Sequence, residues 1–207
     1  MNESGQKEMI KALALSALLL VLAGCHAASP DSGNPRQPSV EFDNGDFLIN
    51  GGHARIGATT KEWISLLGDN YRYANSGSPG MMVWDELGIF VYTDLPMKDR
   101  VDTVAFAFNT DLDEGPGSSD APATIRPRKP FPGQVVVSST RINGDMKISD
   151  IPAASNMMLE VHCSKGIAIC TTNRVDGTSR NYSISFTVDE KQYESLPYTI
   201  EIGRALE

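Results

Sequence analysis

Few residues in this chain of 207 are suited to catalysis or metal binding: it has three histidines and three cysteines. His26 follows Cys25, His53 falls in a predicted turn, and His162 precedes Cys163. None belongs to an H-E-x-x-H zinc motif, and the sequence has no G-x-S-x-G elbow of a serine hydrolase and no G-x-x-x-x-G-K-[ST] phosphate loop. We therefore predict that the protein is not an enzyme; an enzyme whose catalytic set lies outside these motifs is the alternative.

One acidic group resembles a metal ligand set. Asn109, Asp111 and Asp113 alternate as in the opening of a calcium loop. Glu114 stands where such a loop needs a sharply turning Gly, and no Glu closes the loop at its twelfth position. A solvated acidic loop explains the pattern better, so we predict no metal and no cofactor.

Asp85 and Glu86 form a second acidic pair, directly after Trp84. Neighbouring residues of a strand point to opposite faces of the sheet, so these two carboxylates are not expected to act together as an acid and a base. We expect them in a turn or at a sheet edge.

The two downstream cysteines, Cys163 and Cys170, are expected to form a disulfide. Six residues separate them, and a turn at Gly166-Ile167 places them opposite each other across a hairpin, at a spacing that suits a disulfide. The chain has no C-x-x-C redox motif, and only His162 lies near enough to suggest a metal site. In an oxidising periplasm, two thiols this close are expected to pair.

Residues 1–24 have the pattern of a cleavable signal peptide. Lys7 and Lys11 precede the apolar run 12–23, which is too short to span a bilayer comfortably. The run ends in Leu-Ala-Gly-Cys, which resembles the lipobox of bacterial lipoproteins and predicts a covalent lipid (palmitate) on Cys25. An ordinary secretory leader is the alternative, and the true start is either Met1 or Met9.

These features predict a protein anchored by lipid at the periplasmic face of a membrane. Several acyl chains on one residue need no basic helper patch, and His26, in place of Asp, after the lipidated cysteine favours the outer membrane. The two candidate starts also leave room for a minor cytosolic form.

The formal net charge of −8 limits the classes of partner. Nucleic acid is an unexpected partner, because binding phosphates requires clustered cations. A basic protein is a better electrostatic match, since opposite potentials speed encounter. A role of the charge in solubility alone is the other interpretation.

The chain divides into five segments by composition. The signal peptide is followed by the lipidated cysteine and a Pro/Ser-rich tether at 25–40, a first β-rich unit at 41–110, a Pro/Gly-rich loop at 111–134, and a second β-rich unit at 135–207. Both units begin with an apolar run, a turn and a return strand, as in residues 47–56 and 135–148.

We predict an α+β fold, mainly antiparallel β, made of two diverged hairpin-helix-meander units packed in one globular region. In the first unit, Thr59 and Glu62 form a capping-box pattern before a short helix that Gly68 ends. The second unit places Ile151 to Met158 at the position of that helix, and its turn at Asp176-Gly177 joins two late strands.

The loop at 111–134 is the predicted partner-binding segment. Its acidic start precedes a basic end, and an aromatic residue follows the basic end, a combination that suits contact with a protein. A linker without a role is the alternative. The candidate contact residues are Asp111, Asp113, Glu114, Arg126, Arg128, Lys129 and Phe131.

The mature sequence resembles a known class of lipoprotein. The lipobox, the segments IGATTKEWISLLG and WDELGIFVY, and the late cysteine pair are similar to those of lipoprotein immunity proteins for type VI secretion lipase effectors. The resemblance implies a periplasmic inhibitor that binds an incoming phospholipase from a sister cell. Its motifs are structural, so it assigns no catalytic residues.

A second resemblance gives the alternative function. The G-x-T…W…L-G helix is also similar to that of the small SmpA/OmlA-type lipoproteins, which scaffold outer-membrane complexes. Such a protein would have a permanent envelope partner rather than a toxin. A lipase-like toxin encoded in the adjacent gene favours immunity, whereas adjacent envelope-assembly genes favour the scaffold.

Overall fold

Two-residue turns join the first strands, and their residue types suit the backbone they adopt. Asn44-Gly45 and Asn50-Gly51 all have positive φ, as a type I′ hairpin turn requires, and Asn and Gly tolerate that conformation best. Ser138-Ser139 makes a third turn of the same kind, also at positive φ. Three tight hairpins therefore build most of one sheet.

The computed structural model describes residues 38–75, 78–93, 99–110, 126–154, 159–164, 166–172, 182–189 and 191–204. The chain forms two units, 1–36 and 37–207, and all described residues belong to the second. No helix among the described residues is long and apolar enough to cross a membrane. The predicted signal peptide, lipobox, start sites and Asp176-Gly177 turn lie outside the described residues.

The described elements are mostly strands. In chain order they are β1 Ser39–Asp43, β2 Asp46–Ile49, β3 Gly52–Arg55, α2 Thr60–Leu67, β4 Arg72–Asn75, β5 Ser78–Trp84, β6 Ile89–Thr93, β7 Val101–Ala107, β8 Gln134–Val137, β9 Thr140–Ile142, η2 Ile148–Asp150, α3 Ile151–Ala154, β10 Val161–Cys163, β11 Ile169–Thr172, β12 Tyr182–Thr187, η3 Gln192–Glu194 and β13 Thr199–Arg204. The prediction of an α+β fold, mainly antiparallel β, is confirmed.

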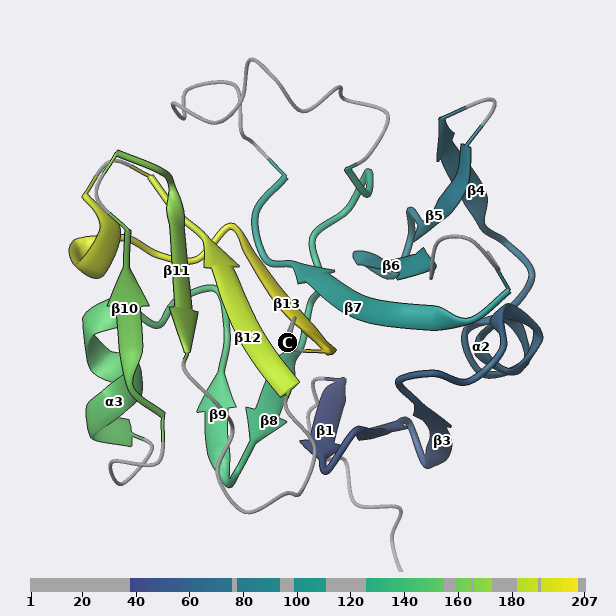
Figure 1. The fold of residues 1–207 in the computed structure, drawn as a ribbon, viewed down its shortest axis with the longest axis horizontal. Coiled ribbons are helices and arrows are strands. Elements are labelled where there is room, and N and C mark those ends of the chain that lie inside the picture. The colour runs from purple at the N-terminus through teal and green to yellow at the C-terminus, as the bar shows by residue number, and fades with distance from the viewer. Residues whose placement is uncertain are drawn as a thin grey trace, which may run out of the picture. The chain divides into compact units, whose positions relative to one another are not determined.

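The strands form two sheets. The five-stranded sheet has the order β3-β2-β1-β8-β9, in which β1 and β8 are parallel and the other pairs antiparallel. The eight-stranded sheet is antiparallel throughout, in the order β10-β11-β12-β13-β7-β6-β5-β4. Figure 1 shows β7 and β13 side by side in the middle of this sheet, with β4 and β10 at its two edges.

One apolar core lies between the sheets. The ring of Phe47, from the five-stranded sheet, lies 6.3 Å from that of Phe106 in the eight-stranded sheet and 5.5 Å from that of Trp63 on the helix, measured between ring centroids. All three side chains are fully buried. In β7, Val104 and Phe106 face this core while Ala105 and Ala107 pack in a second apolar cluster, as the two-residue period of a strand requires.

The helix α2 begins and ends where its sequence indicates. Thr59 Oγ1 accepts a hydrogen bond from Glu62 N, and Thr59 N donates to Glu62 Oε2 at 2.8 Å, which completes the capping box. The side-chain hydrogen bond from Thr59 lowers the pKa of Glu62. Gly68, at φ 93°, ends the helix and donates to Ile64 O.

In the second half, one prediction needed correction. The return strand expected to reach Ile148 ends at Ile142, because Asn143 Oδ1 accepts a hydrogen bond from Asp145 N and turns the chain. Ile148 instead begins the 3-10 turn η2, which leads directly into α3. The helix expected over 151–158 does begin at Ile151, as α3 over Ile151–Ala154, and residues 155–158 lie outside the described residues.

Candidate functional site

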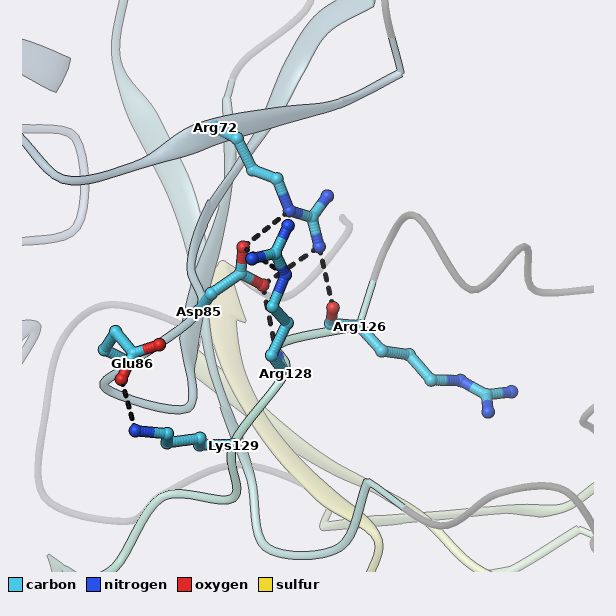
Figure 2. Close-up of polar contacts among 6 residues, drawn as sticks. All are labelled: Arg72, Asp85, Glu86, Arg126, Arg128 and Lys129. Atoms are coloured by element: carbon cyan, nitrogen blue, oxygen red, sulfur yellow. Dashed lines mark hydrogen bonds and ion pairs between the residues drawn. The ribbon is translucent and has the colours of Figure 1, made fainter.

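The charged residues at the basic end of the 111–134 loop meet a turn of the eight-stranded sheet. That turn follows β5 and begins with Asp85 and Glu86. The prediction that these two residues lie in a turn or at a sheet edge is confirmed. Leu87 N donates to Trp84 O at 3.1 Å, and Gly88 turns the chain into β6 at φ 68°. We call the six charged residues gathered here the Asp85 cluster: Arg72, Asp85, Glu86, Arg126, Arg128 and Lys129 (Figure 2).

The Asp85 carboxylate is the centre of this cluster. Arg72 in β4 donates to it through Nε (2.8 Å, to Oδ2) and Nη2 (3.1 Å, to Oδ1), the bidentate geometry in which Arg–carboxylate pairs are strongest. Arg128 donates its backbone N–H to Oδ1 at 3.1 Å, and its Nε lies 3.6 Å from Oδ2. The side chain of Asp85 is only 17% exposed, so solvent screens these contacts less than it would at an open surface.

Backbone contacts fix the segment 126–131 against the same turn. Arg72 Nη2 donates to Arg126 O at 2.8 Å, Lys129 N donates to Asp85 O at 3.1 Å, and Phe131 N donates to Ala107 O. These bonds run along the whole return segment. Its path is therefore set by neighbours on β4, on the β5–β6 turn and on β7.

Gly88 is required by this close approach. A Cβ at that position would lie 2.1 Å from the backbone nitrogen of Phe131, and the residue also has positive φ. Any side chain there would push the return segment away from the turn. The glycine thus helps to position residues 126–131.

The charged groups differ in exposure. The Arg72 side chain is 29% exposed, whereas those of Arg128 and Lys129 are 76% and 62% exposed. Lys129 Nζ lies 2.5 Å from Glu86 Oε2 at the surface. The cluster therefore has a partly buried anchor, the Arg72–Asp85 pair, and an exposed outer layer of cations on a fixed backbone.

Arg126 behaves differently from its neighbours. Its carbonyl accepts from Arg72, but Figure 2 shows its side chain extending away from the Asp85 carboxylate. Its Nε is buried and makes no hydrogen bond to the described part of the chain. The cluster therefore includes a third guanidinium, which is not directed at Asp85.

The predicted contact residues fall into three groups. Arg126, Arg128 and Lys129 come together in the Asp85 cluster. Asp111, Asp113 and Glu114 lie outside the described residues. Phe131, expected to be an aromatic contact for a partner, is instead 6% exposed and packs in the core, with its ring centroid 5.1 Å from that of Phe106. A partner cannot reach this ring while the core is closed.

Arg72 is the residue of the site that the sequence did not reveal. It lies in a short strand, 13 residues before Asp85, and no local motif links the two. The pairing of β4 with β5, with a register shift between Tyr73 and Asn75, brings the guanidinium to the turn. Only the strand pairing could have indicated this contact.

The other chemically capable residues lie elsewhere. His53 lies in β3, opposite Leu48, rather than in the predicted turn. His162 Nε2 lies 3.6 Å from Glu160 Oε2, and both side chains are more than half exposed. Cys163 pairs with Cys170 in the strand register, and the structure joins them by a disulfide. Among the described residues, no three His, Cys, Asp or Glu side chains gather as metal ligands.

Comparison with known proteins gives one match. The family model described as a domain of unknown function (DUF7738) matches residues 39–152. These residues include every strand of the five-stranded sheet, the helix α2 and all of the Asp85 cluster. No curated protein and no solved structure matches the chain.

Proposed function

The chain belongs to the family described as a domain of unknown function (DUF7738), and from the Asp85 cluster we propose that it is a binding protein: a periplasmic, lipid-anchored immunity protein that neutralises a type VI secreted phospholipase. One observation carries the proposal. The Asp85 carboxylate holds the backbone at residue 128, while the Arg128 and Lys129 side chains are 76% and 62% exposed.

A fixed, exposed cationic surface suits protein recognition for an energetic reason. Binding is weakened by the entropy lost when mobile loops and side chains become ordered, and a segment already held in place loses less. Arginine is also common among the residues that dominate binding free energy. The Asp85 anchor thus favours a recognition role over that of a passive linker.

The sign of the local charge indicates the partner's surface. Four cations and two anions make up the Asp85 cluster, a local excess of positive charge on a chain of net charge −8. Complementary potentials favour the correct partner and penalise others. We expect the partner surface that meets Arg128 and Lys129 to be acidic. The rest of the partner is expected to be neutral or basic, because it faces a chain whose net charge is −8.

The lipid anchor is part of this proposal. The lipobox at 22–25 supports acylation of Cys25, and the tether to β1 then confines the domain to a layer near the membrane, with the outer membrane favoured. A phospholipase must reach that same layer to act. Tethering therefore raises the effective concentration of the inhibitor where the enzyme's substrate lies.

We also propose that the two halves of the domain are diverged copies of one unit. The hairpins β2–β3 and β8–β9 support this, because their positive-φ turns at Asn50 and Ser138 lie 88 positions apart. The fully buried Trp63 and Ile151, in the helices that follow, lie the same number of positions apart. In the eight-stranded sheet, β4–β7 and β10–β13 each form a meander, and the last strands of the two meanders pair with each other.

The test is inhibition of a phospholipase by the domain in solution. The mature chain with Cys25→Ser is used to capture partners from cells, and a captured phospholipase, or the one encoded by the adjacent gene, is titrated with it. Stoichiometric loss of lipase activity is the expected result. Capture of resident envelope proteins only, with no effect on the lipase, would favour the scaffold alternative instead.

A charge-reversal variant connects inhibition to the site. Arg128→Glu/Lys129→Glu keeps the backbone contacts to Asp85 but reverses the exposed charge, and it should weaken inhibition by roughly tenfold or more. Lys147→Glu is the matched control, because Lys147 is half exposed and ion-paired with Glu194 near the opposite edge of the sheet. Equal loss of inhibition in both variants would contradict the assignment of the site.

A further inference from the structure

Exposed apolar side chains gather at one place on the described part of the chain. The described residues include six exposed large hydrophobic side chains, and four of the six lie in two neighbouring segments: Ile167 (54%), Ile169 (42%), Tyr193 (43%) and Leu196 (48%). The first two belong to the hairpin closed by the Cys163–Cys170 disulfide, and the others lie in or just after η3. We call these four residues the disulfide knob.

Covalent and polar contacts hold this knob together. Gln192 Nε2 donates to Ser164 O at 2.7 Å and to Ile167 O at 3.1 Å, so one amide bridges both sides of the hairpin turn. Tyr193 Oη accepts from Cys163 N at 3.1 Å. Gln192 has φ 49°, a conformation unusual for a residue other than glycine, and its side-chain bonds to the hairpin account for its presence there. The exposed apolar atoms therefore sit on a fixed support.

We propose that the disulfide knob rests in the interfacial layer of the lipid bilayer and orients the tethered domain on the membrane. The inference rests on the proposed lipid anchor. Cys25 and Ser39 are 14 positions apart, so the tether cannot extend beyond roughly 50 Å and typically reaches about 20 Å. An exposed apolar surface held this close to a bilayer meets lipid constantly.

The tether also explains why so small a knob suffices. Four half-exposed side chains bury little apolar area, and alone they would give only weak partition into a bilayer. Once the lipid has confined the domain, the second contact is effectively intramolecular, so weak partition is enough to select one orientation. Two lysines lie at this edge: Lys191, beside Gln192, is exposed, and Lys147 pairs with Glu194. A lysine side chain is long enough to reach lipid phosphates while its stem stays on apolar surface.

This orientation would leave the Asp85 cluster accessible. The knob lies at the β10–β11 edge of the eight-stranded sheet, and β5, which leads to Asp85, lies at the other side; Figure 1 shows the two edges far apart. Six strand spacings separate β10 from β5, or roughly 30 Å of sheet. With the knob on the bilayer, the turn that displays Arg128 and Lys129 lies at the distant side of the sheet, where an arriving protein can reach it.

The test is flotation with vesicles of phosphatidylethanolamine and phosphatidylglycerol, using the mature chain with Cys25→Ser so that no lipid anchor contributes. At a lipid concentration high enough to detect weak partition, a measurable fraction of the parent chain should float with the vesicles, and Ile167→Ser/Ile169→Ser should reduce that fraction roughly tenfold. The control is Tyr73→Ser/Leu87→Ser, which removes similarly exposed apolar side chains at the opposite edge and should bind as the parent does. Unchanged thermal unfolding of each variant confirms that the fold is intact.

Three results would overturn the inference. They are no flotation of the parent chain, equal flotation of the knob variant, and a knob-dependent dimer in sedimentation without vesicle binding, which would assign the surface to a second copy of the chain. The vesicles contain no phospholipase, so failure here leaves the inhibition test intact. Failure of inhibition, conversely, does not alter vesicle binding.

Discussion

The two edges of the eight-stranded sheet are held by different chemistry and present different surfaces. At the β4–β5 edge, the Arg72–Asp85 ion pair fixes a segment that displays charge. At the β10–β11 edge, the Cys163–Cys170 disulfide fixes a hairpin that displays apolar side chains. The same architecture thus supports a cationic surface by electrostatics and an apolar one by a covalent bond.

The difference shows how each kind of surface can be kept in place. Exposed apolar groups tend to collapse inward, and a short disulfide loop prevents the hairpin from doing so. Exposed cations repel one another, and the partly buried Asp85 carboxylate beneath them offsets that repulsion while it accepts hydrogen bonds from the Arg72 side chain and the Arg128 backbone. Each support can be removed separately, which makes the comparison testable.

The largest effect should come from Phe131, the apolar part of the charged edge. Phe131→Ala should reduce the free energy of unfolding by about 3–5 kcal/mol, because it empties a core site next to Phe106. Chemical denaturation measures the loss. Leu87→Ala, at a 37% exposed position near the same turn, should change stability by less than about 0.5 kcal/mol. Unchanged stability of the Phe131→Ala variant would contradict the buried position of this ring.

The next largest effect should come from the ion-pair anchor itself. Asp85→Ala removes the carboxylate that accepts from the Arg72 guanidinium and from the Arg128 N–H. It should lower the free energy of unfolding by about 2 kcal/mol. Hydrogen exchange should rise at residues 126–131 and stay unchanged at the disulfide hairpin. Glu86→Ala is the control, since its exposed pair with Lys129 contributes at most about 1 kcal/mol. Faster exchange at both edges would mean that they are not independent.

The disulfide edge should respond to the converse change. Cys163→Ala/Cys170→Ala frees a loop with a sequence separation of 7 and should lower stability by about 2 kcal/mol. Exchange should then rise over 161–172 but not at residues 126–131. A reductant should reproduce the effect in the parent chain and have no effect on the variant. Equal stability of reduced and oxidised protein would contradict the role of the disulfide.

Local features of this fold were readable from the sequence, and pairings between distant residues were not. The Thr59–Glu62 cap, the end of the helix at Gly68 and the Asn50-Gly51 turn each depend on residues a few positions apart. The cysteine register followed from the same kind of spacing, because six residues and a glycine turn define a hairpin. These signals need no knowledge of the rest of the chain.

The strand β13 was missed although its residues alternate. It lies in the middle of the sheet, between β12 and β7, and its partner Ala105 is almost a hundred positions from Glu201. A charged residue at the centre of a short segment near the end of the chain argues against a central strand. For the same reason we did not predict the parallel pairing of β1 with β8 or the contact of Arg72 with Asp85. In each case, the sequence around one residue does not indicate which distant residue it contacts.

The smallest expected effect comes from Glu201, the charged residue in β13, which lies between the two edges of the sheet. Glu201 pairs with Ala105 on β7 and Ser185 on β12, and burial raises the pKa of its carboxyl from 4.5 to about 7. Between these two values the folded chain holds a proton that the unfolded chain has released. The free energy of unfolding therefore falls as the pH rises through that window.

Glu201→Gln should remove this dependence. Parent and variant should have similar stability at pH 5, and the variant should be more stable at pH 8 by about 1 kcal/mol. This amount is smaller than the full pKa shift implies, because the Glu201 side chain keeps some contact with water. Denaturation curves at both pH values measure the difference. Because Glu201 lies between the edges, the change in stability should leave hydrogen exchange at residues 126–131 and 161–172 in the same proportion to each other. If Glu201→Gln raises hydrogen exchange at one edge alone, the centre of the sheet is coupled to that edge. The two edges would then not be independent of the centre of the sheet.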